Sequence, residues 1–558
     1  MSDILKGGGF FNRYLIEATL TAQAPFHIGN GELKERNDLK DDDGNALKVS
    51  EVISDTNGKP YLPGSSTRGI MRQWLRECMT ITSQRLELHT DNAVKDILKI
   101  EDAKHRDEKL LQYLLAHTSA IEKLFGTTLA EGKLEVWDAT CATTVKTGSS
   151  PWLAGWRQDR ITYVAKSVAI DPATGTAEDK KLYNFELVPE GVSFKLKLSG
   201  QNLSDEEMGI VLLLLNAFDD DMNPMTLGSM GKRGFGQFST TIDAVYRLEA
   251  SQLPEWRTFA QTGTVAGYET LKRDIFKLDD AAIATLRSTA PSTQKPDSFR
   301  EKWSMKLETP MVIRSGGKFG WKNAPGSKMR NKEMKFVWGF PKCDPLTEVG
   351  DLNFSIRIEG DEAKPYYHIP SSSIRGALRE WAVTQLLPKE CWNLEQCIKE
   401  IINGKQKPKY LDDILSLFGF AIETGDKLIT EKYTKAGRLS IHAAPFSGNE
   451  PEPFVHGTWS NTGNHYGPEN ATRHVATRNP IDRITHAARD GGLHSFLEFS
   501  AGQLVDVIIH IDDPTEFDKN LSAAWKEEIN SGMIRFGGLT GVGRGRVSIS
   551  LKEVCCDA

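Results

Sequence analysis

Four sequence motifs occur twice along this chain, in the same order in each half. The clearest is a proline followed by small hydroxyl residues and arginine, Pro63-Gly64-Ser65-Ser66-Thr67-Arg68-Gly69 and later Pro370-Ser371-Ser372-Ser373-Ile374-Arg375-Gly376. The others are a Phe-Gly turn before a strand (125–126 and 418–419), an Arg-Ile-Thr segment (160–162 and 483–485) and a glycine-rich segment before the last strand (228–238 and 537–547). Ordered repeats at an offset of about 300 residues indicate an internal duplication. The sequence therefore predicts two similar domains.

Each copy of the proline motif predicts a strand end followed by an amphipathic helix. The proline stops the strand, the hydroxyl residues are suited to capping, and the arginines lie near the start of the helix. Free backbone N–H groups at a helix N-terminus, together with Ser and Arg side chains, would suit a phosphate. One copy alone would favour an ordinary N-cap with a solvated arginine. The recurrence indicates shared architecture and leaves shared function open.

Length and composition limit the classes of protein to consider. A chain of 558 residues is too long for one typical core and suggests two to four domains. The net charge of −6 excludes a global positive field, so any site for a polyanion must be a local patch. No apolar run is long enough to cross a membrane and the start lacks a signal-peptide pattern, which predicts a cytoplasmic protein.

The seven cysteines are an odd, scattered set with no Cys-x-x-Cys pair. This pattern argues against both a disulfide framework and a structural zinc site, and predicts reduced thiols. They are Cys78, Cys141, Cys343, Cys391, Cys397, Cys555 and Cys556.

We place the domain boundaries around a stretch rich in Pro, Ser and Thr that follows an expected helix at Tyr268 to Leu286. The predicted division is a first domain at 1–250, a linker with a helical segment at 251–298, and a second domain at 299–558. In both domains an alternating strand (15–24 and 305–309) should enter a Gly-rich loop, and a helical region (70–124 in the first) should follow the proline motif.

Three further segments of the pattern bear on function. Asp171 to Gly175 indicates the tip of a protruding β-hairpin between two strands. Glycines in the last repeated motif let a backbone approach a phosphate closely, although tight strand connections also use glycine. The stretch from Glu32 to Gly44 is too polar for a core and is expected to be a loop, with the longer stretch from Lys318 to Glu362 as its counterpart.

Taken in order, these motifs resemble the RAMP superfamily of CRISPR-associated proteins, most closely the Cas-seven-type backbone subunits of type III effector complexes. The resemblance covers nearly the whole chain twice, and a tandem fusion is similar to those of type III-D systems. It implies an α+β fold with two tandem ferredoxin-like or RRM-like domains, each with a β-hairpin thumb and Gly-rich loops. It also implies that the chain binds a guide crRNA along the RNA backbone, pairs it with a complementary target RNA, and assembles with other Cas subunits, away from any membrane.

The resemblance also implies which residues contact the guide RNA. Two lesser candidates, His27 and Arg314, lie beside the first Gly-rich loop of each half, and an ordinary hydrogen-bonded histidine explains His27 equally well. The main candidates come from the proline motifs and the last glycine-rich segments: Ser65, Ser66, Arg68, Arg72, Lys232, Arg233, Ser372, Ser373, Arg375, Arg379, Arg544 and Arg546.

In the family that the chain resembles, target RNA is cut in a metal-dependent reaction, here expected to use Mg²⁺, that needs an Asp between the first Gly loop and the proline motif. The 2′-hydroxyl can act as nucleophile, so the protein mainly holds the backbone in line and supplies acid, base or metal ligation. The position counted back from Pro63 falls near Lys48 or Val49, and from Pro370 near Ser355. The sequence departs from the family pattern here, because Asp38, Asp41, Asp42 and Asp43 lie earlier than the first position, while Asp351 lies close to the second. These five are the candidate catalytic residues, with no metal ligand set identified, although Asp-Asp-Asp-Gly is also a normal solvated turn.

Three functions stay open at this point. The leading hypothesis is a tandem backbone subunit that binds guide RNA and cleaves the paired target. The second is a non-catalytic guide-RNA scaffold in the same complex. Replacing the four first-half aspartates should abolish cutting, with RNA binding intact, only if the first hypothesis holds. A metal-independent endoribonuclease would use His27 as general acid or base and would cut in the presence of chelator.

Overall fold

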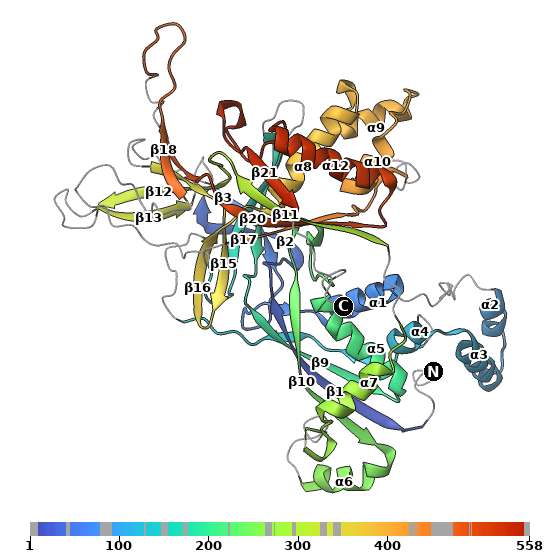
Figure 1. The fold of residues 1–558 in the computed structure, drawn as a ribbon. Coiled ribbons are helices and arrows are strands. Elements are labelled where there is room, and N and C mark those ends of the chain that lie inside the picture. Colours follow the sequence, from blue (N-terminus) through green and yellow to red (C-terminus); the bar gives the residue numbers. More distant parts are fainter. Residues whose placement is uncertain are drawn as a thin grey trace.

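Two antiparallel sheets with the same strand order form the centres of the two halves (Figure 1). The first runs β10-β1-β9-β6-β4, with β5 also paired to β9, and the second runs β21-β11-β20-β17. Their strands are β1 (Asn12–Ala22), β4 (Tyr61–Leu62), β5 (Leu134–Val136), β6 (Ala139–Cys141), β9 (Ser193–Gln201), β10 (Phe238–Glu249), β11 (Ser298–Leu307), β17 (Leu439–Ser447), β20 (Leu504–Asp512) and β21 (Val547–Leu551).

These features belong to a computed structural model of the chain. It describes residues 9–40, 45–78, 92–127, 130–146, 155–170, 177–220, 224–262, 271–272, 274–292, 297–323, 332–338, 348–422, 430, 432–447, 473–489, 492 and 494–551.

The central strand of each sheet is buried because its alternating apolar side chains face a helical layer. In β1, Ile16 pairs with Leu198 on one side and Val245 on the other, and all three are fully buried. In β11, Trp303 and Met305 are equally buried. Burial of one such side chain stabilises the fold by about 1.5 to 3 kcal/mol, so these strands are major contributors to the two cores.

Two helices complete each half in the same order. In the first half α1 (Gly64–Cys78) follows β4 and α5 (Asp205–Asn216) follows β9; in the second, α8 (Ser371–Leu386) precedes β17 and α12 (Glu516–Ser531) follows β20. In Figure 1 α8 and α12 lie together beside β11 and β21. Each half is thus a β-α-β-β-α-β unit, and the prediction of an α+β chain with two tandem ferredoxin-like domains is confirmed.

A further matched pair, which we did not find in the sequence, stabilises the second helix of each half. Ser204 and Glu207 form a capping box at the start of α5, and Lys133 binds Glu207 at 2.7 Å. The second half repeats the arrangement at α12 with Thr515 and Asp518, and Arg438 binds Asp518 at 2.7 Å. The signal was present in the sequence as Ser/Thr-x-x-Glu/Asp before an apolar run.

A second sheet in each half carries the hairpins. It runs β2-β3-β8-β7 in the first half and β13-β12-β14-β19-β18 in the second, with β3–β8 and β14–β19 parallel and the other pairs antiparallel. Its strands are β2 (Gly29–Lys40), β3 (Ala46–Val52), β7 (Tyr163–Ile170), β8 (Ala177–Leu187), β12 (Arg314–Asn323), β13 (Lys332–Trp338), β14 (Glu348–Leu352), β18 (Arg473–Arg478) and β19 (His494–Phe499). The predicted hairpin is confirmed as β7–β8, while its expected tip at 171–175 lies outside the described residues.

The prediction of a loop from Glu32 to Gly44 is wrong over most of its length. Residues up to Lys40 belong to β2, which pairs with β3 although its sequence is mostly polar. Leu39 is buried, and Arg36 is buried against carboxylates, so paired charges replace apolar side chains on this strand. The longer second-half stretch likewise forms strands. Among them, β13 pairs with β12 and has no counterpart in the first-half sheet.

A hairpin of the second half completes the core of the first. It consists of β15 (Phe354–Glu359) and β16 (Glu362–Tyr367), and its Ile356, Ile358 and Ala363 are buried in the first-half core. The Ile358 N–H donates to Glu190 O at 2.8 Å. In return, Leu39, Val49 and Val164 of the first half lie in the core of the second. The two halves therefore form one interlocked body.

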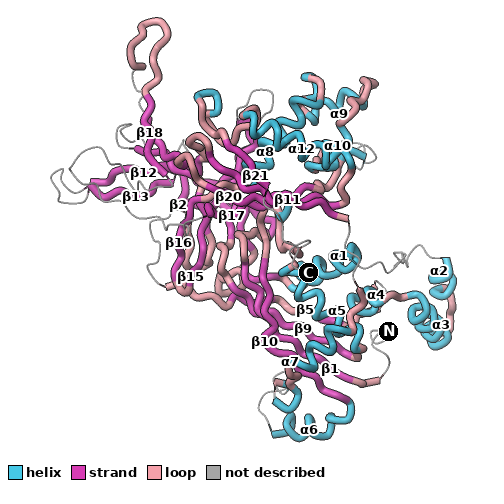
Figure 2. The backbone as a smooth tube through the Cα atoms, viewed as in Figure 1, coloured by secondary structure: helices cyan, strands magenta, loops and turns pink. Residues whose placement is uncertain are grey.

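The remaining helices lie around these cores. They are α2 (Asn92–Leu98), α3 (Ala103–His117), α4 (Ala120–Phe125), α6 (Leu253–Thr262), α7 (Asp280–Ser288), α9 (Leu394–Ile402) and α10 (Leu411–Phe418), and Figure 2 shows α2 and α3 apart from the central sheets. The linker helix predicted at 268–286 is shorter, because α7 begins only at its Asp279 N-cap. Leu286 of α7 packs into the first-half core; the domain boundaries themselves stay a prediction.

Two cysteines differ from the expectation of reduced thiols. Cys391 and Cys397 form a disulfide with their Cα atoms 4.6 Å apart, because a short 3₁₀ turn followed by α9 brings them together. That expectation is therefore wrong for this pair. Among the described helices, none has both the length and the apolar composition needed to cross a membrane.

Candidate nucleic-acid interface

A cleft of about 1690 Å³ lies where the two halves meet. The first half contributes its β7–β8 hairpin and its last Gly-rich segment. The second half contributes the start of α8, the first strand of the β15–β16 hairpin and the segment Gly537–Gly541. Motifs from different repeats therefore line one surface. Of the residues predicted to contact RNA, Arg233, Arg314, Ser372, Ser373, Arg375 and Arg379 line it.

The arginine of each proline motif anchors the end of a later helix, α4 in the first half and α10 in the second. Arg68 donates to the carbonyl of Phe125 at the end of α4, and Arg375 donates to the carbonyl of Phe418 at the end of α10, at 2.6 Å. Helix C-termini leave carbonyls without intrahelical partners and carry a partial negative charge, which a guanidinium satisfies. The proline motif and the Phe-Gly turn thus recur together because each provides one side of the same contact.

The two proline-motif helices begin differently. The Gly64 N–H of α1 donates to the Asp138 carboxylate at 2.7 Å, so this N-terminus already carries an anion. At α8 the Ser371 hydroxyl instead accepts from Ala443 N–H at 3.0 Å, and no side chain caps the helix. Ser65 and Ser66 are exposed within the first turn of α1 and are not its cap. A phosphate is therefore better accommodated at the start of α8.

The two Gly-rich segments have the same backbone. Each contains one 3₁₀ turn, η2 (Gly231–Arg233) or η7 (Thr540–Val542). Met230 and Leu539 precede these turns at φ 66° and 62°, and Gly234 and Gly543 end them at 85° and 87°. A Cβ at Gly236 or Gly545 would lie about 2 Å from a carbonyl oxygen, so glycine is required there.

The basic residues occupy different positions on this shared backbone. Lys232 and Arg233 lie in η2, where η7 has Gly541 and Val542. Arg544 and Arg546 lie beyond η7, and Arg544 binds the buried carboxylate of Glu498 at 2.8 Å. The Arg546 side chain is exposed, and its backbone N–H donates to the Thr309 hydroxyl at 3.0 Å. The two segments therefore offer different surfaces to a ligand.

Three arginines from both halves converge on the cleft. The pKa of Arg375 is lowered to about 10 by burial and then by the positive charges of Arg233 and Arg379, so it stays charged at neutral pH. Arg233 also donates to the Tyr183 hydroxyl at 2.9 Å, and Tyr183 stacks on Phe185. Mutual repulsion of guanidinium groups is relieved when an anion lies between them, and the adjacent aromatic pair suits a base.

The η2 turn also docks the first half onto the second. Lys232 binds the Asp512 carboxylate, and Gln237 Nε2 lies 2.9 Å from His442 Nδ1. A Cβ at Gly234 would lie 2.7 Å from Ser371 Oγ, so the turn is in close contact with the start of α8. Lys232 is therefore a contact between halves in this structure.

His27 and Arg314 occupy equivalent places. The His27 ring meets Phe185 edge-on at 6.1 Å, and the Arg314 guanidinium lies over Phe496 at 5.3 Å. The His27 Nδ1–H donates to Glu186 O at 2.7 Å and its Nε2 lies 3.3 Å from Ser50 Oγ. Burial lowers the pKa of His27, so the ring is neutral at pH 7 with both nitrogens engaged. This environment suits a structural role.

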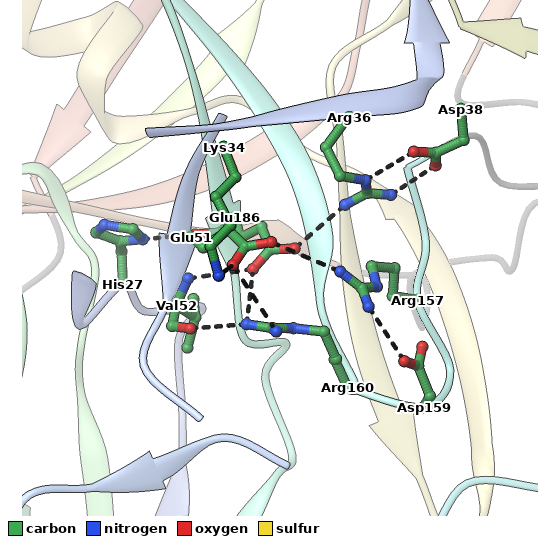
Figure 3. A network of polar contacts seen from close by, with 10 residues as sticks. All are labelled: His27, Lys34, Arg36, Asp38, Glu51, Val52, Arg157, Asp159, Arg160 and Glu186. Atoms are coloured by element: carbon green, nitrogen blue, oxygen red, sulfur yellow. Dashed lines mark hydrogen bonds and ion pairs between the residues drawn. The ribbon is translucent and has the colours of Figure 1, made fainter. Parts of the chain in front are cut away.

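Asp38 of β2 belongs to a network of charged residues that also involves β3 and β8 (Figure 3). Arg36 binds both of its carboxylate oxygens, at 2.8 and 2.7 Å, and also Glu186 at 3.2 Å. These hydrogen bonds from Arg36 lower the pKa of Asp38. Buried Glu186 also accepts from Val52 N–H at 3.1 Å and pairs with Arg160 at 3.5 Å. A metal ion bound by Asp38 would lie close to the Arg36 guanidinium, whose positive charge would oppose its binding.

The other aspartates are placed less fully. Asp41, Asp42 and Asp43 lie outside the described residues, and Asp351 lies in β14 with its side chain outside them. β3 pairs in parallel with β8, and β14 pairs in parallel with β19. The two equivalent registers make Asp351 the counterpart of Glu51, which binds Lys34 at 2.9 Å. Within the described ranges no three His, Cys, Asp or Glu side chains converge as a metal site.

Two histidines at the cleft predict acid sensitivity. Burial lowers the pKa of His368 to about 4, and burial followed by the charges of His510, Lys232 and Arg300 lowers that of His442 to about 4, both from 6.5. Between these values the unfolded chain binds more protons, so the free energy of unfolding should fall as pH drops from 6.5 to 4. The slope is at most about 1.4 kcal/mol per pH unit for each histidine.

Urea denaturation from pH 7 to pH 4.5 measures this dependence. The chain carrying both His368→Asn and His442→Asn should show a flatter profile, since shifted carboxylates contribute equally to both proteins. Parallel profiles for the two proteins would contradict the assignment to these histidines.

A comparison with protein families finds a match to each half of the chain. The model of the RAMP superfamily matches residues 19–239 and 304–548, which together cover more than half of the chain. A search of curated proteins gives no match. The two matched regions coincide with the two ferredoxin-like units.

Proposed function

Because the chain belongs to the RAMP superfamily over both of its halves, and this superfamily is associated with CRISPR RNA binding, we propose that the cleft between the halves holds a guide RNA. The chain would act as a tandem backbone subunit of an effector complex. Its partners would be the guide crRNA, a complementary target RNA and other Cas subunits. The tandem arrangement supports a type III complex, similar to those of type III-D.

The observation that carries this proposal is the convergence of Arg233, Arg375 and Arg379 beside an aromatic pair. The local positive charge arises in a chain whose net charge is −6, so it is a patch suited to phosphate. Phosphate contacts position a strand and do not specify its sequence, as a guide of variable sequence requires. Tyr183 and Phe185 offer a stacking surface that accepts any base.

RNA retained by the purified chain tests the proposal. Extraction should recover RNA, and the RNA-free chain should bind unrelated single-stranded RNAs of equal length with affinities within about tenfold of one another. A chain that retains no RNA and binds none at low salt would contradict guide binding.

We propose further that the loop after β2 cleaves paired target RNA with a divalent metal, Mg²⁺. Arg36 already binds the Asp38 carboxylate, which favours Asp41, Asp42 and Asp43 as the reacting or metal-binding groups. In the assembled complex, replacing these three by alanine should slow cleavage of a guide-complementary RNA by about 100-fold or more. Guide binding should stay unchanged, because the three arginines that converge on the cleft are kept in this variant.

Matched variants separate the alternatives. Asp38→Asn should lose less activity than the triple variant, and Asp351→Ala tests the second half. Cleavage that survives every aspartate variant would instead support a non-catalytic scaffold, an alternative favoured by the engagement of Asp38 with Arg36. Cleavage in chelator that disappears with His27→Ala would support the metal-independent alternative.

A further inference from the structure

A disulfide closes one wall of the cleft. Cys391 ends the 3₁₀ turn η6 (Lys389–Cys391), and Cys397 lies in the first turn of α9. Residues 392–395 lie between the two cysteines, and all four line the cleft. We call residues 391–397 the disulfide turn. The covalent link therefore joins both ends of a continuous piece of the surface that faces the ligand.

The disulfide turn has a fixed side and an open side. Leu394 is buried in the second-half core, and the side chain of Asn393 caps α9 by accepting from Gln396 N–H at 3.0 Å. Trp392 is only partly buried. Its Nε1–H is buried and meets no acceptor among the described residues. Because buried N–H groups are normally paired, Trp392 is suited to donate to a ligand such as RNA, whose phosphates and bases supply acceptors.

The two sulfurs differ in access from solvent. Cys391 is 8% exposed and Cys397 is 1% exposed, and exposed residues at 388–390 precede Cys391 directly. Thiol–disulfide exchange depends on which sulfur a thiolate can reach. Cys397 is enclosed in the second-half core together with Ile398. Cys391 is therefore the sulfur at which a reductant would enter.

We propose that Cys391 and Cys397 form a reversible redox-modification site that sets how strongly the cleft binds RNA. This inference rests on the function proposed above. In the oxidised chain the closed disulfide turn presents Trp392 in one arrangement. In the reduced chain the turn has more freedom, which must be lost again when RNA binds, so the affinity for RNA falls.

A dithiol supplies the two electrons for the reduction. Its thiolate attacks the Cys391 sulfur, the bond between the two cysteine sulfurs breaks, and Cys397 leaves as a thiolate that takes up a proton. The second thiolate of the reductant then displaces Cys391, which is protonated in turn. The chain ends with two thiols and the reductant with one disulfide, and a small-molecule disulfide reverses these steps.

RNA binding by the full chain measures the effect. After bound RNA has been removed, the chain reduced with dithiothreitol should bind single-stranded RNA about 3- to 10-fold more weakly than the oxidised chain, and glutathione disulfide should restore the affinity. The chain with Cys391→Ser and Cys397→Ser should bind like the reduced chain under both conditions. The matched control carries serine at four other cysteines and should keep the full response: Cys141, Cys343, Cys555 and Cys556.

A tryptophan variant tests the route from the disulfide to the ligand. Trp392→Ala should weaken RNA binding to the level of the reduced chain while the disulfide stays intact, and reduction of this variant should then change the affinity little. Mass spectrometry after thiol alkylation reports the state of the disulfide in each sample. A full redox response in Trp392→Ala would overturn the assignment of the effect to this wall of the cleft.

The contrary outcomes separate the redox site from the proposed function. Equal RNA affinity in the oxidised and reduced chains would overturn the redox site and leave guide binding intact, as would a response that persists without Cys391 and Cys397. Absence of RNA binding in both forms would overturn the proposed function. In that case hydrogen exchange of residues 392–395 still tests the disulfide turn: it should become at least about tenfold faster on reduction, and unchanged exchange would overturn the redox site as well.

Discussion

Replacing Ile356 by aspartate is expected to unfold the first half of the chain, although Ile356 belongs to the second. The side chain is fully buried in the first-half core. The variant loses the burial of Ile and places an unpaired carboxylate among apolar groups, so the free energy of unfolding should fall by about 4 kcal/mol or more. Hydrogen exchange should then become faster in β1 and β9 as well as in the hairpin itself.

Two variants of the same hairpin serve as controls. Ile356→Val removes one methyl group and should cost about 1 kcal/mol, while Glu362→Ala on the exposed side of β16 should change stability by less than about 0.5 kcal/mol. Faster exchange confined to 354–367, with β1 and β9 as protected as before, would show that the halves are stable independently.

Removing two of the three converging arginines is expected to have the largest effect on RNA binding. The double variant Arg233→Ala and Arg379→Ala should weaken binding of single-stranded RNA by about 10- to 100-fold at low salt. The slope of log K against log salt should decrease by about 0.7 for each phosphate contact that is lost. Arg375 is left in place because it also anchors the end of α10. Fluorescence anisotropy over a salt series measures both quantities.

A charge-matched control makes this result specific. Lys99→Ala with Lys405→Ala removes two exposed cations that pair with Asp96 and Glu400, and none of these four residues lines the cleft. Affinity and salt slope should hardly change. Equal losses in both double variants would indicate nonspecific attraction to overall charge, and the cleft would no longer be the site. Arg544→Ala should lie between them, because Arg544 is paired with Glu498.

The duplication could be recognised in the sequence because the two halves form sheets with the same strand order. The recurring proline, Phe-Gly and Gly-rich motifs correspond to backbone needs: the anchored ends of α4 and α10, and glycines where a Cβ would meet a carbonyl. A position that only one residue type can occupy, such as these glycines and arginines, is visible in the sequence as that residue. The fold class was implied by the family that this ordered set of motifs resembles.

The composition of the cleft could not be predicted in this way. Arg233 and Arg375 meet only because the halves pack together, and no local pattern encodes a contact between segments so far apart in the chain. The shared backbone of the Gly-rich segments also does not place their basic residues alike, since Lys232 and Arg233 lie within η2 and Arg544 and Arg546 lie beyond η7. The polar sequence of β2 predicts a loop, because the partners of its charges, Glu186 on β8 for Arg36 and Glu51 on β3 for Lys34, are not revealed by the local sequence.

The exchange of buried side chains between the halves has an evolutionary consequence. A crossover between Leu286 and Ser298 would separate Ile356 and Ile358 from the core that they fill, and would expose Val164 of the other half. Recombination at this boundary would therefore yield two defective products, even though each half resembles a complete domain. The two halves are therefore expected to be inherited as one unit. A substitution in a buried residue that one half contributes to the core of the other should be retained only with a compensating substitution in that other half.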